Sequence, residues 1–444
     1  MSPAPGKRQK SSGRKGSGRK SSGRKSGGPQ RSRSRLDDDA ALQASLEHVL
    51  ALAFRDAKGL ARSKDPIDAE AHASSLLAMW SNLELVDQPD SGAFFARAMI
   101  AFLDARATPD ALALLLGRQA VDPVRTMIDA QRAIRRLREA GVAAPSWIED
   151  AGRARLESAW IASDPYGDQD MLVGRFSYEG RAPHDLAVLV DHNILDIAKD
   201  IAVADAAADL RARWEHLPGI LLRDLTAQEY ADHLADALLS LEQVWEPTIT
   251  EGARLLRPLL ASRQLFLPRA RPIKRPYVSQ AARDRLYTAF RRSDPGRSLG
   301  RDTQLVRLFI DYAADYYSDP LHWSPIVVEL FLTDWLPRKV SLFDDEIERL
   351  PLMLRAWLSF VGEQRSFDVH LTGEMLSAVD EHAATFRAVI RDETAFGPAK
   401  SIAAKMEADG VDFSDPKAVQ AWIDDFNARP FDEREAATGG PGPR

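Results

Sequence analysis

Cysteine is absent from this chain of 444 residues. Its absence excludes disulfides, thiolate nucleophiles, cysteine-ligated zinc fingers and iron–sulfur clusters. Histidine is scarce: there are nine, and no two have the HxxxH spacing that HExxH zinc proteases need. No GxxxxGK motif is present, and no GxGxxG follows a predicted strand, so no nucleotide-binding loop is indicated. We therefore predict no metal site and no cofactor.

Long apolar runs are also missing. The longest mainly apolar stretches, such as Ile326 to Leu332, are too short to cross a bilayer. No apolar segment follows the basic N-terminus, as a secretory signal would require. Both absences predict a cytoplasmic protein without a membrane span. Apolar residues nevertheless make up 45% of the chain, which is enough to bury sizeable cores.

Acidic residues are missing from residues 1–35, which contain twelve lysines and arginines, although the whole chain has a net charge of −6. Residues 11–25 read SSGRK, GSGRK and SSGRK, a tandem repeat whose glycine and serine favour flexibility. We predict residues 1–36 to be a disordered basic tail that attracts nucleic acid or another polyanion. The candidate phosphate-binding residues are the Arg–Lys pairs of the repeat: Arg14, Lys15, Arg19, Lys20, Arg24 and Lys25. An acidic membrane surface or protein patch is an alternative partner, and a purely solubilising role is the simplest alternative.

Helical periodicity dominates the chain on both sides of one β-like region, so the predicted fold is mainly α with a small antiparallel β-meander (α+β). We predict a helical domain at 37–145, the β-meander region at 146–220, a second helical domain at 221–431 and a disordered tail at 432–444. The helices predicted in the second helical domain are 227–244, 248–262, 279–292, 302–317, 324–336, 344–362, 372–391, 399–408 and 416–428.

Three short segments rich in apolar or aromatic residues, separated by turn-rich stretches, predict the meander. They are Arg155 to Ala162, Met171 to Tyr178 and Asp185 to Val190. The next stretch, residues 194–203, fits either a helix or a strand.

Polar side chains gather around the turns and ends of these predicted strands. The candidate catalytic residues are Asp164, Asp168, His184, Asp191 and His192, because functional carboxylates and imidazoles often lie just past a strand end. A metal- or acid/base-dependent hydrolase would use them. The simpler interpretation is structural: aspartates in turns bond to their own backbone, and Asp191 or Asn193 caps a following helix.

Asp191 and His192 are the leading catalytic pair, since a carboxylate can orient an imidazole that acts as a general base. Adjacent residues on a strand point to opposite faces, so the two can cooperate only if the strand ends at Val190.

A second basic segment, residues 263–301, contains eleven basic and only two acidic residues, with interleaved aromatic residues. Guanidinium groups pair with phosphate and aromatic rings stack on bases, which favours nucleic-acid binding. The candidate residues here are Arg269, Arg271, Lys274, Arg275, Arg291 and Arg292. The alternative is that these arginines pair with the abundant aspartates and glutamates of the chain.

Five tyrosines and tryptophans lie close together in the sequence: Tyr312, Tyr316, Tyr317, Trp323 and Trp335. Such residues favour pockets and interfaces, although core packing between adjacent helices explains the same spacing. Our leading functional hypothesis is a non-enzymatic protein that associates with nucleic acid through its tail. The alternatives are the hydrolase and a helical scaffold for unknown protein partners.

Overall fold

The computed structural model describes residues 44–81, 91–122, 127–205, 209–244, 247–300, 303–431 and 433–434. The predicted tails, 1–36 and 432–444, lie outside these residues apart from 433–434. Contacts divide the chain after Asp56 into two compact units. In the first unit, residues 44–55 form a helix. All elements below belong to the second unit.

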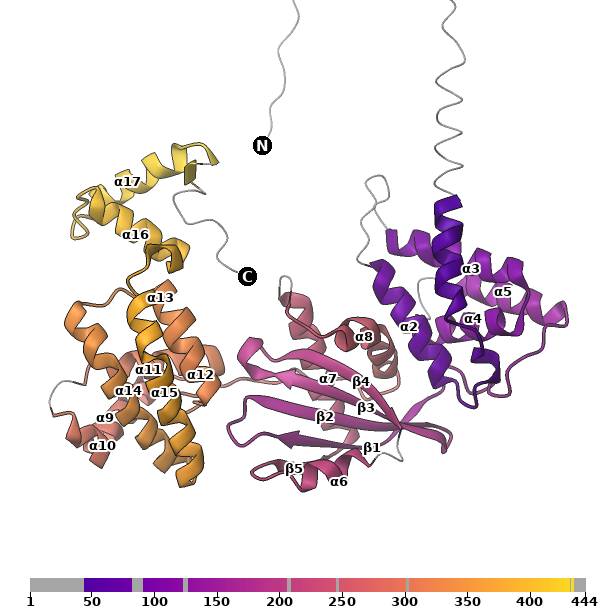
Figure 1. Ribbon diagram of the computed structural model, residues 1–444, viewed down its shortest axis with the longest axis horizontal. Coiled ribbons are helices and arrows are strands. Elements are labelled where there is room, and N and C mark those ends of the chain that lie inside the picture. The colour runs from indigo at the N-terminus through magenta and orange to yellow at the C-terminus, as the bar shows by residue number, and fades with distance from the viewer. Residues whose placement is uncertain are drawn as a thin grey trace, which may run out of the picture. The chain divides into compact units, whose positions relative to one another are not determined.

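The predicted fold class is confirmed: helices dominate, and one antiparallel sheet lies between them in the sequence (Figure 1). In the described residues of the second unit, the α-helices before the sheet are α2 (Ile67–Ser81), α3 (Ser91–Arg106), α4 (Pro109–Val121) and α5 (Met127–Glu139). The start of α4 follows from its sequence. The hydroxyl of Thr108 accepts a hydrogen bond from the N–H of Ala111, and Pro109 occupies the first turn, where no N–H is needed.

The sheet has five strands in the order β4-β3-β2-β1-β5. The strands are β1 (Arg155–Ser163), β2 (Gln169–Tyr178), β3 (Arg181–Asp191), β4 (Ile197–Asp205) and β5 (Leu221–Leu225). The three predicted strands are confirmed, and the ambiguous stretch 194–203 is mostly strand β4. We missed β5, because its five residues, LLRDL, carry little alternation of their own and pair only with the distant β1.

The two faces of the sheet pack against different helices. Helix α7 (Ala227–Gln243) crosses one face, where Tyr230 covers Gly174 of β2 so closely that no larger residue fits. Helix α8 (Glu251–Gln264) packs on β4. On the other face, Trp160 and Val173 form a small cluster with Trp214 of α6 (Leu210–Glu215).

The remaining helices follow α8 in the sequence, and all but the last two surround a large aromatic core. They are α9 (Gln280–Arg292), α10 (Asp294–Ser298), α11 (Leu305–Tyr317), α12 (Pro325–Leu330), α13 (Leu336–Lys339), α14 (Asp344–Arg365), α15 (Val369–Val389), α16 (Pro398–Ala408) and α17 (Pro416–Ala428). Trp323, Phe331 and Trp357 are fully buried at its centre. The predicted helices are confirmed with shifted ends, and 416–428 has the predicted bounds. Within the described residues, no helix is both long and apolar enough to cross a membrane.

One predicted helix, 324–336, is not continuous. A π-helical turn, Phe331–Trp335, separates α12 from α13. Pro337 explains the break, since it has no N–H for the carbonyl of Thr333 and its ring would clash with that carbonyl. The hydroxyl of Thr333 also bonds back to the carbonyl of Glu329, which bends helices.

A buried ion pair connects α2, α8 and the sheet. Nη2 of Arg263 on α8 lies 2.5 Å from Oε2 of Glu70 on α2, and both side chains are at most 1% exposed. The hydroxyl of Tyr178, at the end of β2, donates to the same oxygen, and the N–H of Gly152 donates to the other. Arg263, the first residue of the predicted basic segment, is therefore a core residue and is not available to phosphate.

The crossing of α2 and α4 gives a stability prediction. A Cβ at Gly117 would lie 2.3 Å from the carbonyl oxygen of Ala69, whereas one at Gly373 on α15 would meet nothing within 4 Å. We expect Gly117→Ala to lower the free energy of unfolding by about 1–3 kcal/mol, because the helices must separate. The control Gly373→Ala should be neutral or stabilising by up to about 1 kcal/mol. Urea unfolding measures both, and equal effects would contradict the close crossing.

Candidate functional site

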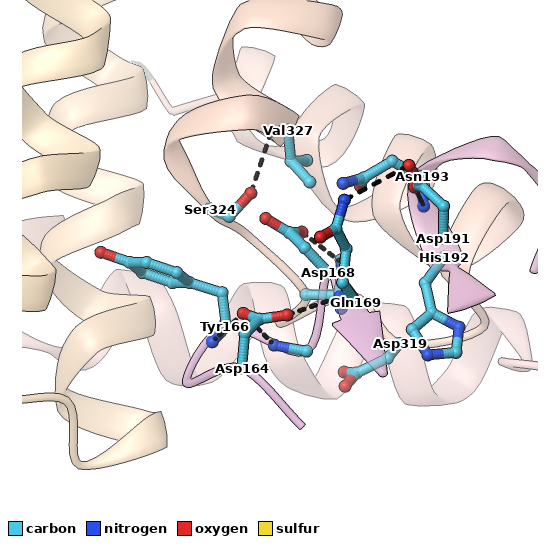
Figure 2. A network of polar contacts seen from close by, with 12 residues as sticks. Asp164, Tyr166, Asp168, Gln169, Asp191, His192, Asn193, Asp319, Ser324 and Val327 are labelled. Atoms are coloured by element: carbon cyan, nitrogen blue, oxygen red, sulfur yellow. Dashed lines mark hydrogen bonds and ion pairs between the residues drawn. The ribbon is translucent and has the colours of Figure 1, made fainter. Parts of the chain in front are cut away.

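The turn between β1 and β2 is organised by Asp164. Its carboxylate accepts hydrogen bonds from the N–H groups of Tyr166, Gly167 and Gln169 (Figure 2). Burial raises the pKa of Asp164 above its ordinary value, although these bonds oppose the rise. Asp164 therefore stabilises the turn through its own backbone, as the structural alternative proposed.

Asp168 lies in the same turn and is buried. Its carbonyl oxygen accepts a hydrogen bond from the N–H of His192, which ties the turn to the end of β3. Its carboxylate Oδ1 lies 3.4 Å from Nε2 of His322, whose ring stacks on Tyr317 with 4.3 Å between ring centroids. No sequence pattern points to His322, which lies in a loop more than 150 residues further along the chain.

Asp191 and His192 do not form the predicted catalytic pair. Strand β3 continues to Asp191, one residue beyond the end that their cooperation requires, and a 3₁₀ turn begins at His192. The Asp191 carboxylate accepts a hydrogen bond from the N–H of Asn193 (Figure 2). It also accepts one from Nζ of Lys199, at 2.6 Å. Asp191 therefore caps this turn, as one version of the structural alternative proposed, and it also pairs with Lys199 of β4.

His192 is instead held between two other carboxylates. Its Nε2 lies 3.0 Å from Asp170 and its Nδ1 lies 2.5 Å from Asp196. Burial by itself would lower the pKa of His192, but the bonds to both aspartates outweigh it and raise the pKa to about 10. With both ring nitrogens engaged and the ring protonated at neutral pH, His192 is not available as a general base.

The polar network continues from Asp196 to a second cation. Arg275 lies 2.6 Å from Asp196 and 2.6 Å from Asp236 of α7. These groups line a cavity of about 170 Å³ together with His233, whose pKa is lowered chiefly by burial. Within the described part of the chain, no three His, Asp or Glu side chains gather so as to hold a metal ion.

His184 lies away from this sheet edge. It pairs with Phe176 at the opposite end of β2 and β3, and its ring stacks on Phe176 at 6.2 Å. Its Nδ1 lies 3.1 Å from the carbonyl oxygen of Ala182, and burial lowers its pKa. The predicted set of five residues thus divides between two places, and His184 belongs to the neighbourhood of Arg263.

The basic segment between α8 and α9 lies along α7. Arg271 donates from Nε and Nη2 to Oδ2 of Asp232, and its backbone N–H donates to Oδ1. Arg275 bonds Asp236, one helical turn further along α7, as well as Asp196. These two predicted phosphate-binding arginines are therefore paired with carboxylates within the chain.

Four other predicted residues of the segment are exposed and have no acidic partner among the described residues. These residues are Arg269, Lys274, Arg291 and Arg292. Because paired, buried and free members alternate along the segment, it is not one continuous basic stripe. The six predicted residues of the tail, Arg14 to Lys25, lie outside the described residues.

The network around His192 predicts a stability that depends on pH. Because the pKa of His192 in the folded chain, about 10, lies above the ordinary value of 6.5, its stabilisation is complete below about pH 6.5. It is lost as the pH rises from there to 10. Urea unfolding at several pH values should show this fall in the unaltered chain and a smaller one in His192→Gln. The same slope in both chains between pH 7 and 10 would show that His192 is not held protonated.

Comparison with protein families, with curated proteins and with solved structures gives no match to this chain.

Proposed function

We propose that this chain is a non-enzymatic protein that binds nucleic acid with little sequence preference through residues 1–35. The observation that carries the proposal is the charge of that segment, which has twelve basic residues and no acidic one. A polycation of this size releases counterions from a phosphate backbone, and such binding depends on charge rather than on base sequence.

The charge pairing of the folded part supports this division of roles. Arg263, Arg271 and Arg275 are neutralised within the chain, so they attract phosphate weakly. Exposed cations without an acidic partner among the described residues remain on α9, at Arg291 and Arg292. These α9 arginines offer a secondary phosphate contact, while residues 1–35 have twelve basic residues and no acidic residue among them.

The hydrolase alternative needs, among its predicted residues, a side chain that is free to accept a proton from a substrate or a water molecule. Both ring nitrogens of His192 are bonded, and His184 is buried beside aromatic rings. Neither arrangement favours acid/base chemistry. The scaffold alternative and the cytoplasmic location stay predictions.

The test replaces the six repeat residues Arg14, Lys15, Arg19, Lys20, Arg24 and Lys25 by glutamine in the full chain. Fluorescence anisotropy at several salt concentrations measures binding to two unrelated labelled duplexes. Because each phosphate contact contributes roughly 0.9 to the slope of log affinity against log salt, the slope should fall by up to about five. Both duplexes should respond alike.

The matched control is the variant Arg291→Gln/Arg292→Gln, which removes exposed positive charge from the folded part. We expect it to lower the slope by no more than about two and to retain most of the affinity. Binding that is independent of salt, or unchanged by the six tail substitutions, would contradict the proposal.

A further inference from the structure

A pocket of about 260 Å³ lies where the turn after β3 meets α11 and the π turn. Four of its nine lining residues are aromatic. Tyr312 and Tyr316 stand one turn apart on α11, with 5.2 Å between ring centroids, and Trp335 lies 5.0 Å from Tyr312. Trp335 is the last residue of the π turn, and π turns recur at functional sites.

These rings differ from the neighbouring core in their exposure. Trp323, of the same aromatic group in the sequence, is fully buried, and Tyr312 is 4% exposed. Tyr316 is 50% exposed, and its ring is perpendicular to that of Trp335. The predicted aromatic cluster therefore divides into a core part and an open aromatic wall, which core packing alone does not require.

The polar residues of the pocket indicate the charge of its occupant. Arg338 donates to both carboxylate oxygens of Asp334, at 3.2 and 3.3 Å, so these two charges balance. Lys339 is exposed and has no acidic partner among the described residues, which leaves the pocket with one positive charge in excess. Oδ1 of Asn193 is buried and has no hydrogen-bond partner. This oxygen can therefore accept a hydrogen bond from a donor group of a ligand.

We infer that this pocket binds one nucleotide unit. The base stacks on the ring of Tyr316, with Trp335 perpendicular to it at the base's edge. The amino edge of the base faces Asn193, and the phosphate binds Lys339. The volume lies below the roughly 300–1,000 Å³ usual for ligand pockets, which limits the occupant to a single unit. This site is separate from residues 1–35 and does not depend on the proposed role of that segment.

The same chemistry can come from a free mononucleotide or from an unpaired base of a single strand. Isothermal titration of the full chain with adenosine 5′-monophosphate tests the first source. We expect saturable binding that Tyr316→Ala weakens roughly tenfold, because it removes one base stack. Tyr316→Phe should retain it, and Lys339→Ala should weaken the mononucleotide severalfold while leaving adenosine unaffected.

Matched controls are Tyr277→Ala, which removes a tyrosine that is 85% exposed elsewhere, and Lys417→Ala on α17. A short labelled single strand, titrated at a salt concentration that suppresses tail binding, tests the second source. If only the binding of the single strand depends on Tyr316 and Lys339, the site binds unpaired bases of a strand. If neither ligand responds to these two substitutions, or the controls have equal effects, the inference is wrong.

Discussion

The buried ion pair between Glu70 and Arg263 is the interaction on which the arrangement around the sheet depends. Two charges shielded from solvent must pair with each other, or the folded state loses several kcal/mol. The Glu70 carboxylate meets Arg263 from α8, Tyr178 from the end of β2 and the N–H of Gly152. Four segments that are distant in sequence therefore have to meet at one point, and this fixes α2 and α8 against the sheet.

The same pairing of arginine with carboxylate decides what the surface can bind. Arg271 and Arg275 follow each other along the segment between α8 and α9 as Asp232 and Asp236 do along α7. Two arginine–aspartate pairs, each four residues from the next along its own element, therefore hold the segment to α7. These two arginines of a basic segment therefore form contacts within the chain, whereas residues 1–35 have twelve basic residues and no acidic residue among them.

The sequence predicts elements well and partners poorly. Periodicity and N-caps such as Thr108 suffice for the helices, because these signals are local. The π turn before Pro337 was missed because the helical periodicity continues through it. The edge strand β5 was missed because it is held by pairing with β1, which is distant in the sequence. The bonds of His192 to Asp170 and Asp196 depend on strand register and on left-handed backbone at Asp196, which adjacency in sequence does not show. The sequence therefore showed where polar residues gather along the chain, but not which of them bond to one another.

A double-mutant cycle on Glu70 and Arg263 tests this account most directly. Urea unfolding would compare Glu70→Gln, Arg263→Met and the double variant. Arg263→Met alone leaves a buried carboxylate and should lower the free energy of unfolding by about 3–5 kcal/mol. The account predicts that the double variant loses clearly less than the sum of the single losses. Losses that add to within about 0.5 kcal/mol would show that the two charges are not coupled and would contradict it.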